Sequence, residues 1–323
     1  MNDIVNPHDS FFRETFGRKE IAASFLREYL PASIREQVDL NSLVMVKDSF
    51  VDKELRQHFS DLLYIVRQRQ GNLYLYLLFE HKSSPDPWIG LQLLRYLVRI
   101  WEQHRKQYPK KRKLPAIVPL VLYHGRRKWK VSYNFRSLIA QNDKHLAQYI
   151  PDFQYRLYDL SALSDEEIHG EVLERISLLL LKHIFNPDLA EKLPEIIALL
   201  QNIESKQNVL DMLEILLRYV VKATKRFEEK DICKILNKTS IREDIMQTFI
   251  DKYIEQGKQQ GKQQGMQQGM RQGSYKILAA MLVQRFGSLP EWAGKKIKEA
   301  DVDSLEDWSI RLLSADNLDE VFH

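Results

Sequence analysis

The pattern of apolar and polar positions changes from helical to strand spacing within the first hundred residues. Apolar residues three and four apart run through residues 8–30 and stop at Pro31, which predicts one helix. Short runs rich in β-branched and aromatic residues then predict three strands. These strands are expected at residues 43–47, 59–67 and 73–82.

A second helix and a fourth strand complete this pattern. Asp86 is suited to cap a helix and Pro87 to begin it, and apolar spacing carries that helix to about Gln107. Residues 117–123 predict the fourth strand, in which Pro119 indicates an edge or a bulge because proline donates no ladder hydrogen bond. The order helix, three strands, helix, strand predicts a compact α/β unit over residues 1–160.

The rest of the chain shows helical spacing, and it divides into two further regions. Residues 161–238 predict a helical region, and residues 239–323 hold a repeat in which glycine recurs every four residues from Gly257 to Gly273. A flexible linker is one interpretation of the repeat. However, helical apolar spacing flanks it on both sides, and a spacing of four drifts by only about 40° per step around a helix. We therefore expect a helix with a slowly winding glycine stripe.

The glycine stripe also predicts self-association. Glycine inside a helix costs about 1 kcal/mol relative to alanine, so five cost about 5 kcal/mol. Close approach of a partner backbone would offset that loss. We therefore expect residues 241–287 and the following helices to form a homodimer or a higher homo-oligomer.

Composition narrows the class of protein. The chain has 323 residues, of which 44% are hydrophobic and 28% charged, so it can bury sizeable cores and is not wholly disordered. No apolar run approaches the ~20 residues of a membrane span, and the start lacks the pattern of a signal peptide. The single cysteine, Cys233, excludes an intramolecular disulfide and a cysteine-rich zinc site. A cytoplasmic protein with no membrane partner is expected.

Charge is unevenly distributed. The formal net charge is +4, yet residues 95–136 hold thirteen Lys or Arg against one acid, Glu102. A solvated helix face is the ordinary interpretation of such a run. Here aromatic residues are interleaved, which favours nucleic-acid contact; they are Tyr96, Trp101, Tyr108, Tyr123 and Trp129. The residues expected to contact phosphates are Arg105, Lys106, Lys110, Lys111, Arg112 and Lys113.

The candidate chemistry lies where the most apolar strand ends. Glu80 and Lys82 are two residues apart, so on a strand they face the same side. A two-residue hairpin loop would set Asp61 opposite Lys82, and a four-residue loop would set Asp61 opposite Glu80. A three-residue loop would put Asp61 out of phase. Either of the first two registers gathers Asp61, Glu80 and Lys82 on one face, within about 5 Å of cross-strand neighbours.

Two clustered carboxylates favour a divalent cation. Two neighbouring negative charges repel each other unless a cation neutralises them. Mg²⁺ is such a cation, because it binds one or two carboxylates together with water and phosphate oxygens. A neighbouring lysine can orient a water that the metal makes nucleophilic, which is the chemistry of phosphodiester hydrolysis. A salt-bridged hairpin end is the structural alternative.

These residues resemble a known superfamily. Asp61 followed by Glu80-x-Lys82 on the next strand resembles the PD-(D/E)XK nucleases, and Gln92-x-x-x-Tyr96 is similar to an element of their RecB-type branch. Four stretches resemble more closely the bacterial Rpn family of recombination-promoting nucleases, also called YhgA-like transposases. The stretches are His8-Asp9-x-x-Phe12-Arg13, residues 79–85, Leu94-Arg95-Tyr96 and residues 119–125.

The resemblance implies a fold and an activity. The fold is a restriction-endonuclease-like αβββαβ core, here residues 1–160, followed by helical C-terminal regions. The activity is that of a metal-dependent DNA endonuclease acting in recombination or in phage defence, with Mg²⁺ or another divalent cation. The alternative is a DNA-binding or assembly protein that keeps the fold with little or no activity.

The resemblance also implies roles for single residues. Asp61 and Glu80 would ligate the metal together with the backbone carbonyl of His81, and Lys82 would position the water. Gln92 and Tyr96, one helical turn apart, would face the same site. Weaker candidates lie on the first helix, where an acid sometimes completes such sites; they are Asp9, Arg13 and Glu14.

Overall fold

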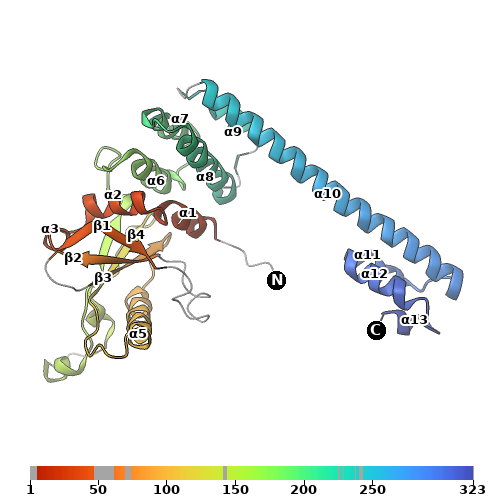
Figure 1. Cartoon of the computed structure of the whole chain (residues 1–323), viewed down its shortest axis with the longest axis horizontal. Helices are drawn as coiled ribbons and strands as arrows, with labels where there is room; N and C mark the ends of the chain where they lie inside the picture. Colours follow the sequence, from red (N-terminus) through yellow and green to blue (C-terminus); the bar gives the residue numbers. More distant parts are fainter. Residues whose placement is uncertain are drawn as a thin grey trace. The chain divides into compact units, whose positions relative to one another are not determined.

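A mixed β-sheet with helices on both faces is the centre of the N-terminal part of the chain (Figure 1). The computed structural model describes residues 6–46, 62–69, 74–140, 144–224, 226–227, 229–236, 238–239 and 243–322. The chain forms two compact units, Met1–Met246 and Gln247–His323.

The sheet of the first unit has five strands among the described residues, in the order β1-β2-β3-β4-β5. Neighbours are antiparallel from β1 to β3 and parallel from β3 to β5. An α/β fold was expected, and the structure confirms it. The strands are β1 (Val38–Met45), β2 (Leu62–Gln68), β3 (Tyr74–Lys82), β4 (Ile117–Tyr123) and β5 (Arg156–Asp159).

The register between β2 and β3 settles one sequence alternative. Leu62 pairs with Phe79 and Arg67 with Tyr74. This is the register of the four-residue loop, in which Asp61 was predicted to face Glu80. Asp61 itself lies outside the described residues, so its position stays a prediction.

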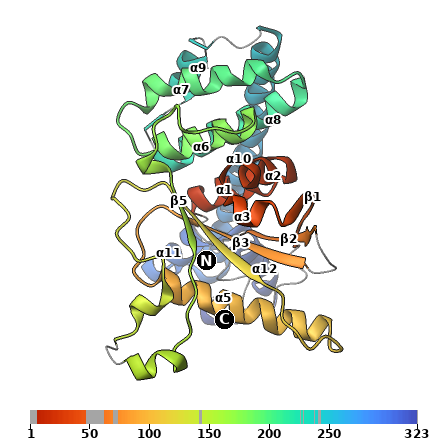
Figure 2. The same cartoon turned by 90° about the vertical axis from the view of Figure 1, so that its left-hand side faces the viewer.

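The N-terminal helix is in fact two helices, which cover one face of the sheet (Figure 2). They are α1 (Pro7–Phe16) and α2 (Lys19–Tyr29), followed by the short α3 (Ala32–Arg35). The break falls at Gly17, which packs so tightly on the preceding turn that a Cβ there would overlap the Arg13 carbonyl oxygen. Aromatic side chains fill the layer beneath; buried examples are Phe12, Phe25 and Phe79.

The opposite face of the sheet is covered by α5 (Ile89–Gln107) (Figure 2). Leu93 and Tyr96 of this helix are buried with Val121 of β4 in one apolar cluster. The helix ends where the sequence predicted but begins at Ile89, two residues later than Pro87.

The position of β4 corrects the prediction of an edge strand. It lies between β3 and β5. However, β5 pairs only with Leu120–Tyr123, so one side of β4 has no strand partner at Pro119 within the described sheet. The missing N–H donor is therefore tolerated.

Short 3₁₀ helices lie in the connections; they are η2 (Phe135–Leu138), η3 (Lys144–Tyr149), η4 (Leu160–Ala162) and η5 (Leu199–Asn202).

Helices make up the rest of the first unit, as the spacing predicted. They are α6 (Val172–His183), α7 (Leu189–Ala198), α8 (Lys206–Thr224) and α9 (Glu229–Leu236). Helix α8 packs on α1, and α6 packs on α2. The helical segment therefore packs on the two N-terminal helices that cover this face of the sheet.

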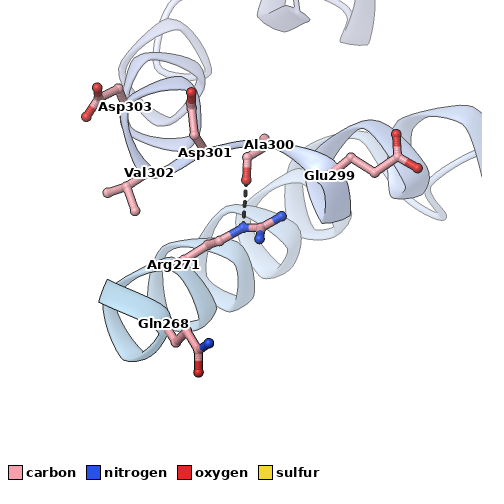
Figure 3. Close-up of a pocket in the computed structure, with 7 residues that line it drawn as sticks. All are labelled: Gln268, Arg271, Glu299, Ala300, Asp301, Val302 and Asp303. Carbon is pink, nitrogen blue, oxygen red and sulfur yellow. Dashed lines mark hydrogen bonds between the residues drawn. The ribbon is translucent and has the colours of Figure 1, made fainter. Parts of the chain in front are cut away.

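The glycine repeat is helical, as predicted. It lies within α10 (Glu243–Phe286), a helix of 44 residues that ends before Gly287, where φ is +83°. In the second unit, the end of α10 packs on α11 (Glu291–Glu299), α12 (Val302–Arg311) and α13 (Leu318–Phe322). Arg271 of α10 donates from Nε to the Ala300 carbonyl oxygen at 2.8 Å, on the wall of a shallow pocket (Figure 3). Among the described residues, no helix combines the length and apolar character that crossing a bilayer requires.

Candidate active site

The C-terminal end of β3 brings a buried acid and a lysine together. Glu80 is only 1% exposed, and its Oε1 lies 3.2 Å from Nζ of Lys82. Both side chains point to the α5 side of the sheet, whereas His81 points to the other side. The same-face arrangement follows from the two-residue period of a strand. An ionised acid at this depth needs the compensation that Lys82 supplies.

Gln92 connects Glu80, Lys82 and Tyr96 through one amide group. Its Nε2 donates to Glu80 Oε1 at 2.9 Å and to Tyr96 Oη at 2.6 Å. Its Oε1 accepts from Lys82 Nζ at 2.7 Å. Both amide hydrogens and the amide oxygen are therefore used, so the orientation of the amide is fixed. The structure thus places four of the five predicted catalytic residues in one hydrogen-bonded cluster.

Asp86 joins this cluster, which sequence reasoning did not foresee. Its Oδ2 lies 3.3 Å from Lys82 Nζ, and its Oδ1 accepts from the backbone N–H of Trp88 at 2.9 Å. The sequence assigned Asp86 only one role, the capping of a helix that begins at Pro87. The available signal was the spacing of four residues between an acid and a lysine at the end of a strand.

One oxygen of Glu80 has no hydrogen-bond partner among the described residues. Oε2 is buried and accepts no hydrogen bond from the described residues. Such an acceptor costs about 1–3 kcal/mol unless water or an ion serves it. The described residues hold no group of three His, Cys, Asp or Glu arranged for a metal. Glu80 and Asp86 are the described carboxylates of the cluster, and both contact Lys82.

The opposite face of β3 carries a separate aromatic cluster. The His81 ring stacks on His124 at 4.7 Å between centroids, and His81 Nδ1 lies 3.3 Å from Asp9 Oδ1. His8 Nδ1 lies 2.8 Å from Tyr219 Oη of α8. Burial, helped by the His81 ring, lowers the pKa of His8 to about 4 and the pKa of His124 well below its usual value.

Two acids of the first helix that were weaker candidates for the metal site have other partners in the structure. Asp9 lies against His81 rather than on the Glu80 side of β3. Glu14 forms an ion pair with Arg218 of α8, with Oε2 2.6 Å from Nη2. These acids bind α1 to the histidine cluster and to α8. The first helix therefore contributes anchoring contacts, and the carboxylates that contact Lys82 among the described residues come from β3 and from the segment that follows it.

The six predicted phosphate-binding residues are all exposed. They occupy the end of α5 and the loop after it, and Lys111 Nζ lies 4.7 Å from the Tyr108 ring centroid. Lys106 is ten residues beyond Tyr96, about 15 Å along the helix axis. A second exposed basic group follows β4, whose last residue, Tyr123, pairs with Lys82. Its members are Arg127, Lys128 and Lys130.

Most of the aromatic residues interleaved with these charges pack or form hydrogen bonds within the fold. Tyr96 and Tyr123 are buried. The indole N–H of Trp101 donates to the Pro115 carbonyl oxygen, and that of Trp129 donates to the Val131 carbonyl oxygen. Tyr108 alone among the five is exposed. The interleaving therefore arises mainly from the packing of α5 and β4.

Comparison with known proteins gives a family for this arrangement. A family model described as "Putative transposase, YhgA-like" matches residues 6–211. Recombination-promoting nuclease RpnD of Escherichia coli O157:H7 is 32% identical over 197 residues, which are 60% of this chain and 74% of RpnD. Recombination-promoting nuclease RpnA of Escherichia coli strain K12 is 31% identical over 196 residues, 61% of this chain and 66% of RpnA.

A relative with a different description matches equally well. The inactive recombination-promoting nuclease-like protein RpnE of Escherichia coli strain K12 is 33% identical over 198 residues, 60% of this chain and 64% of RpnE. No solved structure matches significantly. The family match covers the sheet and the helices up to the first residues of α8, and it leaves the rest of α8 and α9–α13 outside.

Proposed function

The chain belongs to the YhgA-like transposase family, which includes recombination-promoting nucleases, and on that premise we propose that it is a metal-dependent DNA endonuclease. The observation that carries the proposal is the buried Glu80, with Oε1 held by Lys82 and Gln92 and Oε2 left without a partner among the described residues. The fold we propose is the restriction-endonuclease-like PD-(D/E)XK core. A mixed sheet with this carboxylate at the end of β3 and helices on both faces supports that assignment.

The donor atoms at this end of β3 suit a hard divalent cation. Carboxylate oxygens are the ligands that Mg²⁺ prefers, and it needs only one or two of them besides water and phosphate. Glu80 would hold the cation through Oε2, together with Asp61 and the backbone carbonyl of His81, and Asp86 is a further candidate. When bound, the cation would polarise the phosphate and lower the pKa of a water to near neutrality.

The remaining side chains of the cluster would position the attacking water and the metal-binding carboxylate. The Lys82 ammonium, in contact with Glu80 and Asp86, would orient the attacking water and attract the phosphate. Gln92 fixes both Glu80 and Lys82, and Tyr96 fixes Gln92. Because each of these side chains has its hydrogen bonds defined by the fold, little reorganisation is needed when substrate binds.

The DNA would follow the exposed cations. The groups at the end of α5 and after β4 would contact phosphates, which gives affinity without sequence preference. Endonuclease action on cytoplasmic DNA would promote recombination, as the relatives' names state for them, or would degrade the DNA of an invading phage. We also propose that the C-terminal helices assemble the protein into a homodimer or a higher oligomer.

A second candidate function is DNA binding or assembly with a weakly active or inactive nuclease fold. The observation that favours it is the similarity to RpnE, a relative described as inactive. Both functions use the same basic surface. They differ in whether the Glu80 cluster performs chemistry.

Parallel measurements of plasmid cleavage and of DNA binding distinguish the two candidate functions. Supercoiled plasmid would be incubated with the full-length protein in Mg²⁺ and, in parallel, in EDTA, and affinity would be measured in EDTA. We expect relaxed or linear plasmid in Mg²⁺ alone, together with binding in both conditions. Binding without cleavage at any divalent cation tested would favour the second candidate.

A further inference from the structure

Trp88 follows Asp86 of the Glu80 cluster by two residues, and its side chain faces solvent. It is 62% exposed, although the other described tryptophans of the first unit are partly buried and hydrogen-bonded. An exposed indole in isolation needs no explanation. Its position relative to the candidate active site makes it informative.

The backbone of Trp88 is held by two members of that cluster. Its N–H donates to Asp86 Oδ1 at 2.9 Å, and its carbonyl oxygen accepts from the Gln92 N–H at 3.0 Å. Asp86 and Gln92 both contact Lys82 through their side chains. The residue is therefore fixed at the rim of the site by the same groups that hold Lys82. The exposed indole extends into solvent from this anchored backbone.

A cation lies on the same side of α5. Arg95 follows Trp88 by seven residues, which is two helical turns, and it is exposed. Between them, Leu91 is also exposed, at 44%. An aromatic surface with an exposed cation about 10 Å along the helix is the combination that single-stranded nucleic acid binds, by base stacking and by phosphate attraction.

We propose that Trp88 is a stacking platform for a nucleobase of the substrate next to the cleaved phosphate. The inference rests on the proposed nuclease function and specifies its substrate class. Within a duplex both faces of each base are covered by neighbouring bases. The platform therefore selects DNA whose bases near the cleavage point are unpaired, in a single strand, a bulge or a frayed end.

Binding to a fluorescent base tests the platform directly. The full-length protein would be titrated in EDTA into a single-stranded oligonucleotide that carries 2-aminopurine, and into the matched duplex. The variants are Trp88→Leu, which keeps an apolar side chain, Trp88→Phe, which keeps an aromatic ring, and the control Trp292→Leu, at another exposed tryptophan, 47% exposed. Circular dichroism and melting temperature would establish that each variant is folded.

We expect Trp88→Leu to bind the single strand about tenfold more weakly and to lose the quenching of 2-aminopurine, with its affinity for the duplex unchanged. Trp88→Phe should keep most of both signals, and Trp292→Leu should match the wild type. Equal affinity and equal quenching for Trp88→Leu and the wild type would overturn the proposal, as would equal behaviour of the Leu and Phe variants.

Cleavage by the wild type in Mg²⁺ distinguishes the two proposals. Cleavage that is accompanied by unchanged binding in Trp88→Leu would reject the platform and leave the nuclease function standing. Stacking signals that depend on Trp88, without cleavage by the wild type, would support the platform and reject the nuclease function.

Discussion

Gln92 Nε2 lies 2.9 Å from Glu80 Oε1 and is the hydrogen-bond donor that helps hold this buried carboxylate in place. The same amide accepts from Lys82 and donates to Tyr96. The acid and the lysine of the proposed site therefore share one support, which comes from α5 rather than from the sheet. Its removal should disturb both.

Gln92→Glu tests this support with almost no change in shape. The substitution replaces two N–H donors by a carboxylate oxygen beside Glu80, so the two acids repel each other and Tyr96 loses its donor. We expect cleavage to fall about ten- to a hundredfold, as for other residues that orient metal ligands, and the free energy of unfolding to fall by about 1–3 kcal/mol. Plasmid cleavage and thermal melting measure the two effects. Gln103→Glu on the same helix is the control, and an equal loss there would contradict the assignment.

Glu174 predicts a dependence of stability on pH. It is fully buried on α6, it accepts a hydrogen bond from Ser24 of α2, and burial raises its pKa to about 7. The folded protein therefore holds a proton that the unfolded chain releases near pH 4.5. The resulting stability is fully present below the unfolded pKa, falls as pH rises from about 4.5 to about 7, and amounts to about 3 kcal/mol at most.

Melting temperatures between pH 4.5 and pH 8 test this linkage. Glu174→Gln keeps an oxygen for Ser24 and cannot ionise, so its melting temperature should fall less than that of the wild type as pH rises. Glu36→Gln, at an exposed position just after α3, is the control and should follow the wild type. Parallel curves for the wild type and Glu174→Gln would show that the carboxyl does not titrate in this range.

Charge reversal at the end of α5 should weaken DNA binding without regard to sequence. Replacing Lys110, Lys111, Arg112 and Lys113 by Glu removes exposed cations that would displace counterions from phosphates. We expect lower affinity for every duplex tested and a shallower dependence of log Kd on log salt concentration. Reversal of the exposed Lys295 and Lys298 in the second unit is the control. Loss confined to one DNA sequence would mean that these residues read bases.

The glycines of α10 distinguish an isolated helix from an associated one. At Gly265, Gly269 and Gly273, an added Cβ would meet no described atom within 4 Å beyond the neighbouring backbone of its own helix. Alanine at all three positions should therefore stabilise an isolated helix, by about 1 kcal/mol at each site. If a second copy approaches there, as we propose, the methyl groups should instead lower the mass measured by light scattering. An unchanged mass with a higher melting temperature would rule out association through this stripe.

Much of the fold follows from periodicity, because long apolar patterns specify helices and strands directly. The limits of β4 and the end of α5 agree with the sequence, whereas the break at Gly17 does not, because an unbroken apolar stripe conceals a change of direction. The short strand β5 was missed, since its four residues are too few to show a period. Asp86 was missed as a member of the Glu80 cluster because the segment between β3 and α5, rather than a repeating element, places it beside Lys82.

Glu80→Gln is the most direct test of the proposed function. The substitution keeps the shape of the side chain and removes the charge of the proposed metal ligand, and Lys82 keeps its contacts with Asp86 and Gln92. Supercoiled plasmid would be incubated in Mg²⁺ with wild type, Glu80→Gln and the surface control Glu102→Gln, all purified in parallel. We predict cleavage by the wild type and by Glu102→Gln, and none by Glu80→Gln, with DNA binding in EDTA equal for all three. Cleavage by Glu80→Gln at the wild-type rate would contradict the account.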